Sequence, residues 1–292
     1  MPSDLNVGEL QWAEGSDHLV YAAGGASLAI SKDAGATFTD VLPGGCGSAA
    51  KVNHVAVWQN EPADAFPAVI YALGDSTMFL SVDGGVSWTR DMGQLPPRIG
   101  GVTNQSANFN AAHVMAISPR CPLHVFVTEN GSGSQATLYR GDYTRFFGTQ
   151  ASSWSTLPLP EFVVDADNQD SGNVFLLATQ RGRGDLLFYG PQRFSFPNDI
   201  TQSSAWVGPV DPQSGSDWTR LGSGHPDLHG FLLSPDFAAE IDRGQYKPGT
   251  GTLWMLSDGG IYRSADGGQN FSPARTAATL SALSVAGVSI AG

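Results

Sequence analysis

Three histidines stand at matching positions in separate strand-like segments of the chain. His113 and His229 each open the frame His-x-x-x-x-Ser-Pro, and His54 precedes the apolar run 55–58 in the same register. If these segments line a common channel, the three imidazoles converge near one mouth of it and could bind a metal, an anion or a sugar. Alternatively, each imidazole bonds the backbone of a neighbouring segment and so holds the fold together.

A second group of polar residues lies around His229. His225, Asp227 and His229 alternate along the chain, so a strand would place all three side chains on one face. Two imidazoles and a carboxylate suit a metal ion that takes its remaining ligand from elsewhere in the fold. Asp165 and Asp167 fall in the corresponding region of another segment.

Three copies of the pattern Ser-x-Asp-x-Gly-x-x-aromatic indicate the elements that position these residues. The Ser and Asp side chains can bond the backbone amides of a tight turn, and Gly takes the positive φ that the turn needs. The aromatic residue then anchors the following strand. These aspartates are therefore predicted to form turns and not to act as catalysts. The pattern residues are Ser31, Asp33, Gly35 and Phe38; Ser81, Asp83, Gly85 and Trp88; and Ser264, Asp266, Gly268 and Phe271.

Strand-like runs separated by turn signals recur around these turns, and no segment shows sustained helical periodicity. The runs group into five units of four strands each. This grouping predicts an all-β fold, a β-propeller with four-stranded blades. The units span residues 8–42, 53–92, 112–157, 162–221 and 228–273.

The third and fourth units depart from the turn pattern. His54 lies 29 residues before Asp83, and His113 lies 29 residues before Asp142, so Asp142 is predicted to mark a degenerate turn. The fourth unit has lost the pattern, and only its closing aromatic remains. Its strands are predicted at 162–166, 174–179, 185–189 and 217–221.

Residues 280–290 have the character of the first strand of a sixth unit. We expect residues 1–292 to form a single propeller domain. A propeller must close on itself to remove its strand edges. The domain is therefore expected to close as five blades, to belong to a larger propeller, or to close with a second chain, which would make it self-associate.

Charge and composition limit the partners. The net charge is −12, with 15 Lys and Arg against 27 Asp and Glu, which argues against nucleic acid or an anionic membrane as partner. The sequence contains no run of 18 apolar residues, so no membrane span is predicted. The segment 1–6 lacks the basic and apolar regions of a signal peptide, so the chain is either cytosolic or separated from a leader.

The two cysteines, Cys46 and Cys121, either form one disulfide or stay as two thiols.

The three turn segments resemble the Asp box, or BNR repeat, of sialidases, sortilins and xyloglucan-cleaving hydrolases. The segment 225–229, followed by 257–264 (Ser-Asp-Gly-Gly-Ile-Tyr-Arg-Ser) and an Asp box, is similar to extracellular propellers of the sortilin and xyloglucanase type. This resemblance implies a β-propeller in which the box is a folding device. It also implies an extracellular or periplasmic recognition module for glycans or protein segments. No cofactor is predicted.

The same resemblance implies a glycoside hydrolase as an alternative, because xyloglucan-cleaving relatives carry an acid in an Asp-x-Gly-Gly-x-Tyr-Arg stretch. In this chain Ser257 stands where that acid would be. Asp165, Asp167 and Asp227 are then the candidate catalytic acids for the pair of carboxylates that glycoside hydrolysis needs. A sialidase would carry an Arg-Ile/Leu-Pro motif, whose nearest match is 97–100, Pro-Arg-Ile-Gly. A structural or assembly role is the third alternative.

Tryptophans and insertions complete the candidate binding features. Five tryptophans could stack on sugar rings or pack between blades. Insertions at 130–135, 144–151 and 192–216 are long enough to build a binding rim on the propeller. The five tryptophans are Trp12, Trp58, Trp206, Trp218 and Trp254.

Overall fold

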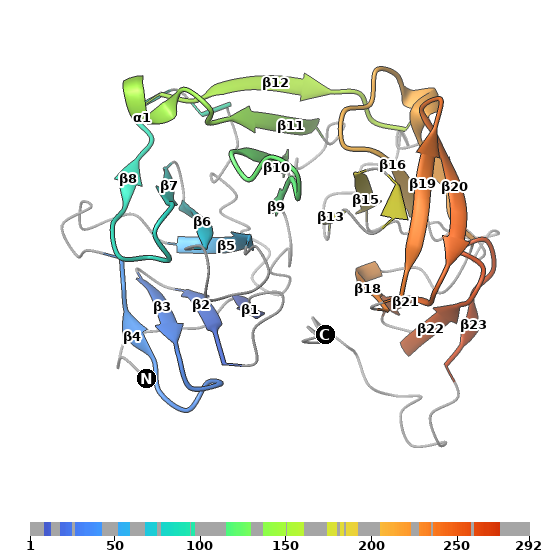
Figure 1. The fold of residues 1–292 in the computed structure, drawn as a ribbon, viewed down its shortest axis with the longest axis horizontal. Helices are drawn as coiled ribbons and strands as arrows, with labels where there is room; N and C mark the ends of the chain where they lie inside the picture. Colours follow the sequence, from blue (N-terminus) through green and yellow to red (C-terminus); the bar gives the residue numbers. More distant parts are fainter. Residues whose placement is uncertain are drawn as a thin grey trace, which may run out of the picture.

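The computed structural model confirms the predicted all-β propeller. Its strands form five four-stranded antiparallel sheets, which are the five blades of the propeller (Figure 1). The structure describes residues 9–12, 18–24, 27–42, 52–58, 68–74, 77–93, 95–96, 115–129, 137–149, 151–160, 174–179, 182–183, 185–191, 205–222, 228–234, 236–257 and 260–274. The predicted strand at 280–290 lies outside these residues.

Within each blade the strands pair in chain order. The first strands of successive blades pack against each other, so they form the inner side of the propeller. Blade one comprises β1 (Glu9–Trp12), β2 (Val20–Gly24), β3 (Ser27–Ser31) and β4 (Thr39–Asp40). Blade two comprises β5 (Val52–Trp58), β6 (Val69–Gly74), β7 (Met78–Ser81) and β8 (Thr89–Arg90).

The other three blades follow the same order. Blade three comprises β9 (Met115–Ile117), β10 (His124–Glu129), β11 (Thr137–Asp142) and β12 (Ser153–Leu157), with α1 (Phe146–Thr149) before its last strand. Blade four comprises β13 (Val174–Thr179), β15 (Leu186–Pro191), β16 (Trp206–Pro209) and β17 (Thr219–Arg220), with the 3-10 helix η1 (Gly215–Asp217) before β17. Blade five comprises β18 (Leu228–Leu233), β21 (Leu253–Ser257), β22 (Gly260–Ser264) and β23 (Ser272–Pro273).

Blade four corrects the predicted strand order. The segment 174–179, predicted as its second strand, is the first strand β13 and pairs with β15. The third strand, β16, lies inside the predicted insertion 192–216. The error arose because β16 is a four-residue run that ends in Gly-Pro, and such a run resembles a loop. The predicted first strand, 162–166, lies outside the described residues.

A three-stranded sheet that was not predicted joins blades four and five. It consists of β14 (Gly182–Arg183), β19 (Ala238–Asp242) and β20 (Gln245–Thr250), with β14 parallel to β19. The β19–β20 hairpin leaves blade five between its first two strands and lies beside β16 of blade four (Figure 1). The hydroxyl of Tyr246 anchors the hairpin by donating a 2.7 Å hydrogen bond to the carbonyl oxygen of Gly267.

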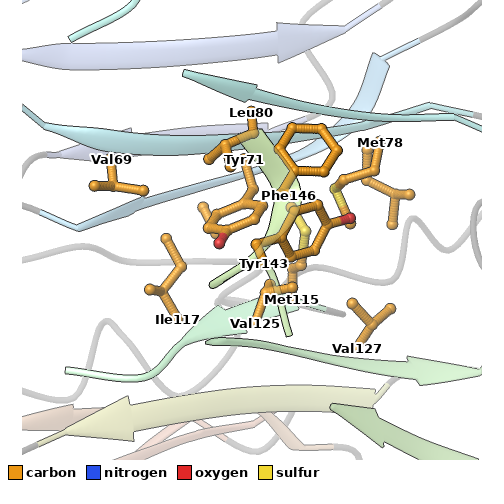
Figure 2. Packing of buried hydrophobic residues seen from close by; sticks show 12 residues of the cluster. Val69, Tyr71, Met78, Leu80, Met115, Ile117, Val125, Val127, Tyr143 and Phe146 are labelled. Carbon is orange, nitrogen blue, oxygen red and sulfur yellow. The ribbon is translucent and has the colours of Figure 1, made fainter. Parts of the chain in front are cut away.

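Four hydrophobic cores lie between consecutive blades. Each contains one aromatic residue from the second strand of the earlier blade. This residue lies one or two positions from the residue that pairs with the end of the third strand. The core between blades two and three is drawn in Figure 2, where Tyr71 lies among side chains of both blades. The four aromatic residues are Tyr21, Tyr71, Phe126 and Phe188, all at most 1% exposed.

Candidate functional site

The three turns that carry the Ser-x-Asp-x-Gly pattern have one hydrogen-bonding scheme. In the first, the backbone N–H of Gly35 donates to Ser31 Oγ at 2.8 Å and the hydroxyl of Ser31 donates to Asp33 Oδ1 at 2.7 Å. The N–H of Thr37 also donates to Asp33 Oδ1, at 2.7 Å. The turns at 81–87 and 264–270 repeat these bonds. Their turn glycines have φ of 89°, as the pattern predicts.

These bonds keep the turn carboxylates ionised. Hydrogen bonds from Thr37 and Ser31 lower the pKa of Asp33 to about 2, and bonds from Ser264 and Asn270 do the same for Asp266. A carboxyl group with such a pKa holds no proton to donate near neutral pH. These aspartates are therefore unsuited to be the general acid of a hydrolase.

The third blade corrects the prediction for Asp142. The register aligns Gly141 with Ser81, so Tyr143 and not Asp142 takes the position of Asp83. Asp142 accepts hydrogen bonds from Thr144, which lies two residues later in the chain. Each turn aspartate instead accepts them from the residue four positions later. The 29-residue spacing therefore does not carry over to blade three, where the strand pairing sets the register.

The pairing register also separates His54 from His229. Val57 and Leu233 occupy equivalent positions, which makes Asn53, and not His54, the counterpart of His229. β5 and β18 carry the same bulge here, so the register places His54 one position away from the position that His229 occupies.

Most other predicted site residues lie outside the described structure. The residues outside it are His113, His225, Asp227, Asp165 and Asp167, and of His229 only the backbone is described. In the sequence, Asp165 and Asp167 precede β13, the first described strand of blade four. Among the side chains that the structure describes, no group of three His, Cys, Asp or Glu could hold a metal ion.

The described residues point instead to the junction between blades two and three. Asp91, which directly follows β8, is buried there with 6% of its surface exposed. Its carboxylate accepts hydrogen bonds from the Tyr143 hydroxyl at 2.8 Å, from the N–H of Gly93 at 2.8 Å, and from the hydroxyl of Ser152. The indole N–H of Trp154 in turn donates to Ser152 Oγ at 2.7 Å. This network is a rigid polar link between the two blades.

Burial and the neighbouring Asp91 carboxylate raise the pKa of Tyr143 well above its usual range. The phenol therefore stays protonated and acts as a permanent donor to Asp91. Its ring packs edge-on against Tyr71, Phe146 and Trp154, with centroid distances of 5.2, 4.9 and 6.1 Å. Figure 2 shows Tyr143 beside Phe146 in this core.

Two large apolar side chains are exposed at this junction. Met92 follows the buried Asp91 and is 68% exposed, and Phe147 follows the buried Phe146 in α1 and is 51% exposed. Each is thus held in place by a buried neighbour while its own side chain meets solvent. Phe147 lies in the insertion 144–151, which the sequence analysis predicts as part of a binding rim.

The comparisons with known proteins support the fold. A structure described as YCF48 bound to a D1 peptide is 17% identical in sequence, with a TM-score of 0.50, and the match covers 93% of this chain and 69% of that one. The likeness shows a shared propeller fold. A GH74 xyloglucanase from Xanthomonas campestris is also 17% identical, with a TM-score of 0.48, over 92% of this chain and 38% of that one. No protein-family model and no curated protein sequence matches the chain.

The tryptophans divide between packing and exposure. Trp206 and Trp218 are buried in the core between blades three and four. At these two positions the indole rings therefore pack between blades and are not available to stack on sugar rings. The indole N–H of Trp58 donates to the carbonyl oxygen of Pro119 at 3.0 Å, also across a blade junction. Trp254 is half-buried, and the side chain of Trp12 lies outside the described residues.

Sequence reasoning did not find the Asp91 network, although a signal for it exists. Asp91 follows the outer strand of its blade, where blades one and four have Val41 and Leu221. A carboxylate at a position that is apolar elsewhere indicates a specific partner.

No helix among the described residues is long and apolar enough to cross a membrane.

Proposed function

We propose that this propeller is a recognition module that binds an apolar segment of another protein at the junction of blades two and three. The observation that carries the proposal is the exposure of Met92 and Phe147 above the buried Asp91 network. Met and aromatic residues are enriched at protein interfaces. Side chains already held by a rigid base lose less freedom on binding, which favours affinity.

Two further observations support a recognition role. The similar YCF48 structure was determined with a peptide bound, so a propeller with this fold can bind a peptide. The three turns also share the hydrogen-bonding scheme of one repeated device, which supports placing the chain in the Asp-box superfamily. That placement in turn favours an extracellular or periplasmic location.

A binding screen on the full chain tests this function. The protein is applied to an array of peptides that span apolar and charged sequences and to an array of glycans. We expect apolar peptides to bind, and Met92→Asp and Phe147→Asp each to lower their affinity at least tenfold. Val86→Asp is the matched control, because Val86 is 84% exposed on a different turn.

Glycan binding with no peptide binding would contradict the protein-segment ligand. Equal peptide affinity of all three variants would contradict the site. Far-ultraviolet circular dichroism of each variant separates loss of binding from loss of folding.

A further inference from the structure

Two features recur at the internal blade junctions. The first, found at all four, is the buried aromatic residue that the earlier blade places under the next one. The second, found between blades one and two and between blades four and five, is a turn glycine of the later blade that packs on the earlier blade. A Cβ on Gly85 would lie 2.7 Å from Cδ1 of Ile30 in blade one, and a Cβ on Gly268 would lie 2.9 Å from Cδ2 of Leu221 in blade four. These contacts leave no room for a side chain at either turn.

Blade five carries the first feature, and no later blade lies among the described residues. Trp254 is at the same register as the four buried aromatics, because Leu253 beside it pairs with Ser264 as Ile70 pairs with Ser81. It is half-buried, however, and belongs to none of the four cores found among the described residues.

The residue paired with Trp254 strengthens the comparison. Trp254 pairs with Arg263, just as Phe126 of blade three pairs with Arg140. Arg140 crosses to blade four and forms a 2.7 Å ion pair with Asp211, which lies in the turn before β17. Arg263 is exposed, and its guanidinium donates only to Thr252 of its own blade among the bonds described. Blade five therefore presents an aromatic residue and an arginine in the arrangement that binds a following blade.

Blade one carries the second feature, and no earlier blade lies among the described residues. Gly35 has the same φ of 89° as Gly85 and Gly268, yet a Cβ built on it would meet none of the described residues within 4 Å. The same turn holds the exposed carboxylate of Asp33. Among the described strands, each inner strand packs on the next, but no comparable packing joins β18 to β1.

We propose that blade five of one copy of this chain docks on blade one of a second copy, head to tail. The face of blade five at Trp254 and the face of blade one at Gly35 correspond to the two sides of a blade junction inside the propeller. Trp254 would cover the turn at Gly35, and Arg263 would pair with Asp33 as Arg140 pairs with Asp211. Such a contact joins two different surfaces, and two copies can therefore extend to more.

Sedimentation velocity of the full chain over a hundredfold concentration range tests the proposal. We expect association that weakens at high salt, because an arginine–carboxylate pair contributes to it. Trp254→Arg and Ala36→Arg, one on each face, should each abolish association. Val86→Arg, on an exposed turn away from both faces, should associate normally. Circular dichroism confirms that each variant is folded.

Mixing the two deficient variants gives the decisive result. Each retains one intact face, so a head-to-tail contact predicts a heterodimer that grows no further. A mixture that stays monomeric, or a full chain that is monomeric at every concentration, would overturn the proposal. Protection of Trp254 from a quencher in a monomer, measured against Trp254→Phe, would also overturn it and would assign this face to the chain's own residues.

Discussion

The hydroxyl of Tyr143 donates a 2.8 Å hydrogen bond to Asp91 across the junction of blades two and three. In blades one, two and five the turn before the last strand is held by its own serine and aspartate. In blade three that position is taken by Tyr143, and the carboxylate comes from the preceding blade. The conformation of one blade therefore depends on the presence of its neighbour.

Tyr143→Phe is expected to lower the free energy of unfolding by about 1–3 kcal/mol, because it removes a donor from a buried carboxylate. Urea denaturation measures the change. In a double-mutant cycle with Asp91→Asn, the two effects should be strongly non-additive. Additive effects would show that the two side chains do not act together.

Acid should weaken the fold through the turn aspartates. The pKa of about 2 that Asp33 and Asp266 have in the folded protein lies below the usual 3.8. Their stabilisation is therefore complete above the unfolded value and is lost as the pH falls from about 4 towards 2. Urea midpoints measured across this range should fall less steeply for Asp266→Asn, since an amide does not titrate. An unchanged slope would contradict the assignment.

Gly85→Ala and Gly35→Ala form a matched pair. Both glycines have φ of 89°, so each substitution carries a backbone strain of about 1–2 kcal/mol. Only at Gly85 does the added methyl group meet the preceding blade, at 2.7 Å from Ile30, which should cost about 1–3 kcal/mol more by overpacking. Thermal unfolding of dilute protein compares the two, and equal losses would contradict the blade packing.

Tyr246→Phe tests the anchor of the β19–β20 hairpin. The substitution keeps the buried ring and removes the hydrogen bond to Gly267, at an expected cost of about 1–3 kcal/mol. Amide exchange should rise in β19 and β20 more than in blade two. A uniform rise in every blade would show that the hairpin does not depend on this bond.

The propeller could be predicted because its signals are local. Ser81, Asp83 and Gly85 make their bonds within one turn, so the residue types alone indicate the structure there. The strand β16 and the hairpin β19–β20 could not be found in the same way. The run 247–251, Lys-Pro-Gly-Thr-Gly, resembles a loop, and only pairing with β19 and packing beside β16 make most of it part of a strand.

The candidate site was less predictable than the fold. The histidine ring rested on spacing, and the pairing register makes Asn53, and not His54, the counterpart of His229. The Asp91 network joins residues more than 50 positions apart, which no local pattern connects. Comparison of Asp91 with Val41 and Leu221 could have identified it as unusual.

The parallel pairing of β14 with β19 has a mechanical consequence. β14 lies in the loop after the first strand of blade four, and β19 lies in the corresponding loop of blade five. In a chain of repeats that contact only their neighbours, each unit can in principle detach alone under force. Here the last two blades share a sheet, so we expect a pulling force to release them together, in a single step larger than one blade.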